Sequence, residues 1–96
     1  MKNYQFRLID NAYNSEDASE LLMALVAEKI RFLKEKISRL EDNSEQAQYE
    51  QRISELKAEL RTLDLMLDEY DGEEVDFGIR CSVQMTVKTP EFSLSN

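Results

Sequence analysis

The chain of 96 residues lacks the side chains on which most catalytic and metal sites depend. It has no histidine and no tryptophan, one cysteine, one proline and two glycines. Without histidine there is no imidazole base, and one cysteine supplies too few ligands for a structural zinc site. Gly72 and Gly78 stand apart, so there is no glycine-rich phosphate-binding loop. We therefore expect a protein that is not an enzyme and that needs no cofactor or metal.

Long apolar runs and paired cysteines are missing too. Cys81 has no partner for an intramolecular disulfide, which favours the cytoplasm as the location. No apolar run follows Met1, so we expect no secretory signal. The longest apolar run, residues 21–27, is far shorter than the ~20 residues of a membrane-spanning helix.

Two stripes of apolar side chains, at alternating steps of three and four, dominate what is present. The first comprises Met23, Val26, Ile30, Leu33, Ile37 and Leu40, and the second Tyr49, Ile53, Leu56, Leu60, Leu63, Leu67 and Tyr70. Such a repeat keeps one seam of a helix facing a neighbouring helix, as in coiled coils. The polar segment 41–45 between the stripes is short. The pattern thus predicts helices over 15–41 and 44–71 that form a long antiparallel hairpin, with Asn43 or Ser44 as a cap.

Strict alternation of apolar and polar residues marks two further segments. Tyr4, Phe6 and Leu8 alternate with polar residues, which predicts a half-buried strand over 3–9 with turn residues at Asp10 and Asn11. Every odd position from 75 to 87 is apolar, which predicts a second strand. We expect one α+β domain over 1–96 in β-α-α-β order, in which the coiled-coil-like hairpin packs on a small antiparallel two-stranded sheet. The tail, 89–96, could dock through Phe92 and Leu94.

The predicted strands differ in length, which leaves part of the second strand without a partner. An unpaired strand edge favours pairing with another chain. A small core also contributes little stability alone. We therefore expect a homodimer, formed through the edge of the second strand, the helical hairpin or both.

Charge is concentrated at one end of the predicted hairpin. Segments 10–20 and 64–76 carry eleven acidic residues and no basic residue, whereas the whole chain has a net charge of −8. An antiparallel hairpin brings these segments to the same end. We name the candidate binding residues there the acidic pole: Asp64, Asp68, Glu69, Asp71, Glu73, Glu74, Asp76, Glu16, Asp17 and Glu20. The alternative is a solvated acidic surface that protects the strand edge from aggregation.

A basic protein surface is the partner that such a pole fits best. The same charge disfavours direct binding to DNA or RNA, and no membrane partner is expected. We therefore expect a non-catalytic protein-interaction or adaptor module. One alternative is a small acidic inhibitor, of the kind phages encode, which mimics nucleic acid and blocks a nucleic-acid-binding protein. Another is a holdase chaperone with a hydrophobic groove between its helices.

The beginning of the chain has a local sequence likeness. Phe6-Arg7-Leu8-Ile9-Asp10, followed by Ser15-Glu16-Asp17-Ala18, resembles the start of small bacterial proteins that carry a Phe-x-Leu-Ile-Asp segment before a helical hairpin. The likeness covers about the first third of the chain and implies a fold but no activity. The hairpin is also similar to that of prefoldin-type chaperones, except that their strands lie between the helices and not outside them.

Overall fold

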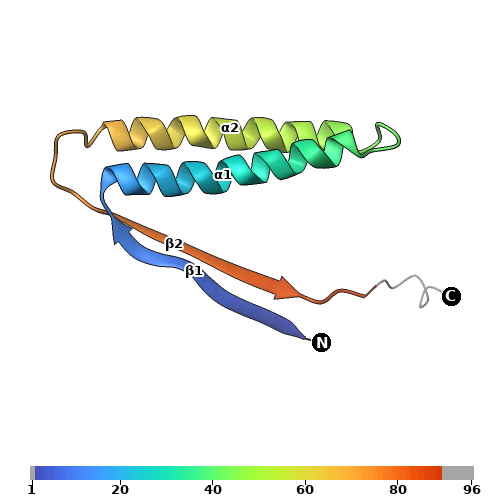
Figure 1. Ribbon diagram of the computed structural model, residues 1–96, viewed down its shortest axis with the longest axis horizontal. Helices are drawn as coiled ribbons and strands as arrows, with labels where there is room; N and C mark the ends of the chain where they lie inside the picture. The colour runs from blue at the N-terminus through green and yellow to red at the C-terminus, as the bar shows by residue number, and fades with distance from the viewer. Residues whose placement is uncertain (1, 90–96) are drawn as a thin grey trace. The chain divides into compact units, whose positions relative to one another are not determined.

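The computed structural model describes residues 2–89 and has four elements in the order β-α-α-β (Figure 1). They are β1 (Asn3–Tyr13), α1 (Ser15–Ser38), α2 (Gln46–Asp68) and β2 (Phe77–Thr86). The predicted α+β class and element order are confirmed. Among the described residues there are two compact units: a sheet unit, residues 2–12 with 78–89, and a hairpin unit, residues 13–77. The single domain and the packing of the hairpin on the sheet stay predictions, as does docking by Phe92 and Leu94, which lie outside the described residues.

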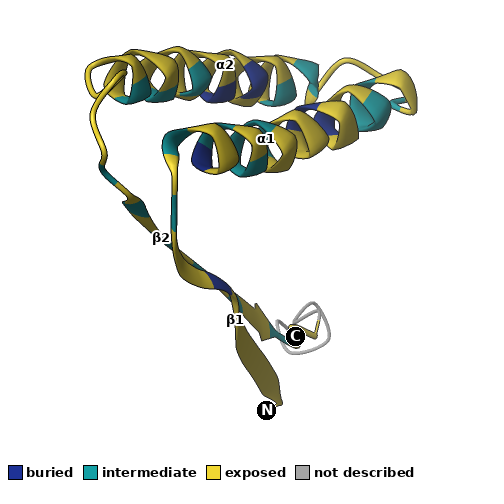
Figure 2. Cartoon of the chain, turned by 60° about the vertical axis from the view of Figure 1, so that its left-hand side comes forward, coloured by how far each residue is buried: buried dark blue, intermediate teal, exposed yellow. Residues whose placement is uncertain are grey.

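The core of the hairpin unit lies on the predicted seam between α1 and α2. Ile30 and Leu33 of α1 and Ile53 and Leu56 of α2 form one buried cluster. Half-buried side chains flank it, namely Val26, Ile37, Tyr49 and Leu60. All eight belong to the two apolar stripes, and Figure 2 shows the buried positions on both helices. The three-four spacing therefore predicted the packing surface correctly, because side chains at that spacing share one helix face.

The hairpin helices are shorter than predicted at three of their four ends. α1 ends at Ser38 and not at residue 41, and α2 runs from Gln46 to Asp68 and not from 44 to 71. Asp42 accounts for the late start of α2. Its Oδ1 accepts hydrogen bonds from the backbone N–H of Ser44, at 2.9 Å, and from the Ser44 hydroxyl, at 2.6 Å. A side chain that binds the backbone two residues on stabilises a turn in place of a helix.

The predicted caps of α2 are also wrong at its start. Neither Asn43 nor Ser44 caps the helix, since the N-cap is Glu45 and makes no side-chain cap bond. At the other end the chain leaves the helix through tight turns, in which the N–H of Asp71 donates to the carbonyl of Asp68 and that of Glu73 to the carbonyl of Tyr70. Gly72 lies between them with a φ of 85°, in the left-handed region that glycine adopts without strain.

The sheet unit contains the antiparallel pair β1–β2, and both strand boundaries differ from the prediction. β1 continues through Asp10 and Asn11 to Tyr13, and β2 covers 77–86 in place of 75–87. No glycine or proline interrupts β1, so these polar residues remain extended and pair with the start of β2. The strands are thus nearly equal in length. We expected strands of unequal length that would leave part of β2 unpaired. The described part of the sheet has no such unpaired stretch.

The register of the sheet follows from one hydrogen bond beside the start of β1 and the end of β2. The N–H of Val87 donates to the carbonyl of Lys2 at 3.1 Å. A regular antiparallel ladder from this bond pairs Tyr4 with Met85, Phe6 with Val83 and Leu8 with Cys81. These six residues share one face, which is the apolar face. Rings of Tyr4 and Phe6 lie 5.6 Å apart, as expected for neighbours on that face.

A bend in β1 separates this regular ladder from the rest of the strand. Arg7 and Asp10, three residues apart, form an ion pair of 2.8 Å, although a flat strand would direct them to opposite faces. β1 also has one residue more than β2. Both observations indicate a β-bulge at Ile9 and Asp10, where two residues oppose Arg80. Ile9 is the one buried residue among those described in the strands, with 7% of its surface exposed.

Candidate acidic binding site

The ten residues of the acidic pole all lie in the hairpin unit. Glu16, Asp17 and Glu20 occupy the first turns of α1, and Asp64 and Asp68 the last turns of α2. The other five lie in the connection from α2 to β2: Glu69, Asp71, Glu73, Glu74 and Asp76. Because the helices are antiparallel, the start of α1 and the end of α2 meet at one end of the hairpin, as Figure 1 shows. The two helix ends therefore supply five of the ten acids, and the connection supplies the other five.

Four acidic side chains of the pole share one hollow. Glu16, Glu73, Glu74 and Asp76 line a depression of about 490 Å³ together with Asn14, Ser15 and Val75. The connection after α2 brings the last three acids back beside the first turn of α1. At the two ends of this connection, the aromatic rings of Tyr70 and Phe77 pack edge to face, with their centroids 5.7 Å apart. The hollow is thus a concave carboxylate surface on a defined stretch of backbone.

The remaining acids of the pole are not in this hollow. Asp17 and Glu20 line a second depression, of about 420 Å³, with Tyr13, Leu21 and Ala24. Asp64, Asp68, Glu69 and Asp71 line neither depression. The eleventh acid of the two acidic segments, Asp10, lies in the sheet unit and pairs with Arg7.

All ten carboxylates of the pole are exposed to solvent. Within residues 2–89, none of them takes part in an ion pair or accepts a side-chain hydrogen bond, since the acids that do are Asp10, Glu28, Glu35, Asp42, Glu45, Glu50 and Glu55. Their charge therefore remains uncompensated by the described side chains. Like charges in water repel over roughly 8–10 Å, the screening length at physiological salt. The pole consequently presents unpaired negative charges to a partner.

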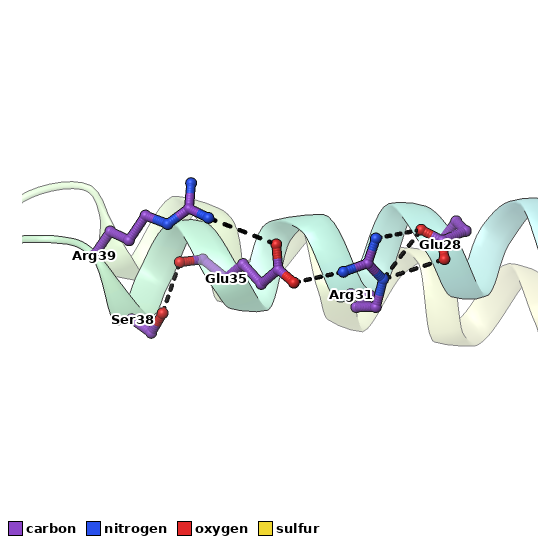
Figure 3. Close-up of polar contacts among 5 residues, drawn as sticks. All are labelled: Glu28, Arg31, Glu35, Ser38 and Arg39. Atoms are coloured by element: carbon purple, nitrogen blue, oxygen red, sulfur yellow. Dashed lines mark hydrogen bonds and ion pairs between the residues drawn. The ribbon is translucent and has the colours of Figure 1, made fainter.

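Two groups of charges elsewhere on the hairpin form ion pairs, and the larger lies on α1. Arg31 lies between Glu28 and Glu35 on the outer face of α1, with N–O distances of 2.8 and 2.5 Å, and Glu35 also approaches Arg39 at 3.8 Å (Figure 3). A hydrogen bond from Arg31, together with its positive charge, holds the pKa of the Glu28 carboxyl below its usual range. The same contact raises the pKa of the Arg31 guanidinium. The contrast with the pole is that these acids already have partners.

Among the described residues, 2–89, no group of three or more Cys, Asp or Glu side chains is close enough to hold a metal ion. The carboxylates of the pole are spread over two helix ends and a connection. Such spacing suits several separate basic groups better than one cation.

Sequence reasoning missed a mixed-charge hollow on the polar face of the sheet. Arg7, Ile9, Asp10, Arg80 and Ser82 line a depression of about 380 Å³. Arg7 and Arg80 stand at ordinary polar positions of alternating strands, so the sequence offered no signal for them. Only the register and the bulge bring them together.

Comparison of this chain with models of protein families, with curated proteins and with solved structures yields no match. Neither helix of residues 2–89 is long and apolar enough to cross a membrane.

Proposed function

We propose that this chain is a non-catalytic protein-interaction module of the cytoplasm whose acidic pole binds a basic surface of a partner protein. One observation supports this proposal above the others: ten exposed carboxylates gather at one end of the hairpin, and none is paired within residues 2–89. Surface acids on the outer face of the same hairpin do have partners, such as Glu28 and Glu35. A surface with unused acceptors can bind a cationic partner without first breaking its own ion pairs.

The carboxylates that line the hollow favour an arginine side chain of the partner over a lysine. Glu16 lies in the first turn of α1, and Glu73, Glu74 and Asp76 face it from the connection. Arginine fits such a site better than lysine because its planar guanidinium donates several hydrogen bonds to carboxylates at once. The contact would be steered by long-range attraction, so its association rate should fall steeply with added salt.

A comparison of matched charge variants tests the proposal. The pole variant carries Glu73→Gln, Glu74→Gln and Asp76→Asn. The control carries Glu41→Gln, Glu45→Gln and Glu59→Gln, which removes the same charge from exposed positions outside the pole. Each protein is immobilised and exposed to lysate, and bound proteins are eluted with rising salt. We expect a basic protein that the original chain and the control retain and that the pole variant loses. Equal retention by all three would contradict the proposal.

The absence of bases from the pole also supports a second function, inhibition of a nucleic-acid-binding protein by mimicry of phosphates. The captured partner distinguishes the two. Under mimicry, added DNA or RNA displaces this chain from the partner. Under simple adaptor binding, the partner holds this chain and nucleic acid together, or binds no nucleic acid.

A further inference from the structure

The apolar face of the sheet is exposed along both strands. In β1 the exposed fractions are 60% for Tyr4, 41% for Phe6 and 50% for Leu8. Near the end of β2 they are 58% for Met85 and 54% for Val87. These five make up half of the large hydrophobic residues that are exposed in the described chain. Within the sheet unit, nothing covers Tyr4, Phe6 and Leu8, although the alternation predicted a half-buried strand.

The face is continuous because of the register. Leu8 lies opposite Cys81, Phe6 opposite Val83 and Tyr4 opposite Met85 on the regular part of the ladder. No acidic or basic residue occupies this face between Tyr4 and Leu8 or between Ile79 and Val87. Arg7 and Arg80 belong to the opposite face, where they line the mixed-charge hollow. A partner could cover the face from the Tyr4–Met85 pair to the Leu8–Cys81 pair without burying a charge, which removes the main cost of such a contact. Lys2, opposite Val87 in the same ladder, lies at the margin of this area.

The size of the face decides what kind of occupant it fits. The five exposed side chains present on the order of 500 Å² of apolar surface, near the upper limit for the largest patch on a typical monomer. Complete burial of these side chains in two copies, with the half-buried Ile79, Cys81 and Val83 included, would reach at most about 1,200 Å², the lower limit of specific dimer interfaces. An apolar face without charged side chains between Tyr4 and Leu8 can pack against the same face of a second copy, as a two-fold contact requires.

We propose that the apolar face of β1 and β2 binds the same face of a second copy of this chain. The contact stacks two two-stranded sheets and buries Phe6, Leu8 and Val83 at its centre. It does not involve the acidic pole, so the two proposals can fail separately.

The first test measures how the alkylation rate of Cys81 in the unmodified chain depends on protein concentration. Cys81 is the only cysteine and is half-buried on the apolar face. In a face-to-face dimer the second copy covers its thiol. The rate constant for alkylation of Cys81 by iodoacetamide should therefore fall about tenfold as protein concentration rises from well below to about fifty times the dissociation constant found by sedimentation equilibrium. A monomer throughout the series, with a constant alkylation rate, would overturn the proposal.

Variants then locate the contact. Leu8→Ser with Val83→Thr removes apolar surface at the centre of the face and should weaken dimerisation at least tenfold. Gln5→Ser with Gln84→Thr changes adjacent positions of the same strands on the polar face and should leave it unchanged. Far-ultraviolet circular dichroism checks that each variant keeps its helices, and the alkylation series remains decisive should one unfold.

Edge pairing is the competing arrangement, and it predicts a different result. In the ladder set by the bond between Val87 and Lys2, even-numbered residues of β2 direct their N–H groups to the free edge. Ser82→Pro removes one such donor without changing the face. A dimer that is lost in Ser82→Pro but kept in Leu8→Ser with Val83→Thr would overturn the face-to-face proposal.

Discussion

The N-terminus of α1 is capped by a side chain, whereas the N-terminus of α2 is not. Asn14 precedes α1 in an extended conformation, and its Oδ1 accepts a hydrogen bond from the N–H of Asp17 at 2.7 Å. The corresponding residue of α2, Glu45, has helical dihedral angles and makes no such bond. The first N–H groups of a helix lack partners within it, so a side-chain acceptor there stabilises the first turn.

Replacement of Asn14 by alanine should destabilise the chain by about 1 kcal/mol, because the N–H of Asp17 loses its acceptor. Asn14→Ser keeps an acceptor of suitable length and should recover most of the loss. Urea unfolding followed by circular dichroism measures both free energies of unfolding. An alanine variant as stable as the original chain would show that this bond contributes nothing.

The pairing of Glu28 with Arg31 predicts a pH-dependent effect. Arg31→Met should raise the pKa of Glu28 towards its usual value, because both the hydrogen bond and the positive charge are lost. A lowered carboxyl pKa contributes stability above the carboxyl's usual value, and that stability is lost as pH falls through the lowered value. The stability difference between variant and original should therefore shrink below about pH 4.

Carboxyl NMR titration of Glu28 measures this shift directly. Arg52→Met, which breaks the separate ion pair between Arg52 and Glu55, is the control and should leave Glu28 unchanged. A Glu28 titration that is identical in the original chain and in Arg31→Met would contradict the expected cause.

Leucines of α2 are buried or exposed according to their position on the helix. Leu56 has 9% of its surface exposed and belongs to the buried cluster, whereas Leu65 has 68% exposed. Leu56→Ala should cost about 2–4 kcal/mol through lost burial and a residual cavity. Leu65→Ala should change stability by less than about 0.5 kcal/mol. Urea midpoints of the two variants test this, and similar losses at both positions would show that Leu65 is covered by another surface.

The end of α2 is unfavourably charged, since its last turn contains no basic residue. Asp68 ends the helix, where the dipole is negative. Asp68→Asn should stabilise the chain by about 0.3–1 kcal/mol at low salt and by less at high salt. Asp64→Asn, one turn further from the end, should have a smaller effect. Thermal unfolding at two salt concentrations compares them, and a loss of stability in Asp68→Asn would oppose this account.

How far the sequence predicts each element depends on the range of the interactions that define it. The seam residues Ile30, Leu33, Ile53 and Leu56 follow from spacing, because a helix face is a local property. The ends of the helices do not follow from spacing. Asp42, for example, accepts hydrogen bonds from Ser44, and these bonds stabilise a turn where the pattern predicted the start of α2. The extension of β1 to Tyr13 depends on pairing with β2, which is distant in sequence.

For the whole molecule, the location of the acidic pole was predictable but its internal arrangement was not. An antiparallel hairpin places Glu16 near the end of α2 whatever the details. The hollow also needs Glu73 and Asp76 to return beside α1, which depends on turns around Gly72. The exposed apolar face was not anticipated either, because alternation marks the apolar side of a strand but not whether anything covers it.

The two strands of the sheet are the first and last of the four described elements, and the whole hairpin lies between them. During synthesis on the ribosome, β1 emerges first and has no strand to pair with until β2 has been made. The hairpin contacts are closer in sequence and close smaller loops, so they should form earlier. Tyr4, Phe6 and Leu8 must therefore stay unpaired until the hairpin and β2 have been made. A message that ends before the codons of β2 would yield a folded hairpin with a permanently unpaired apolar strand, a product prone to aggregate in the cell.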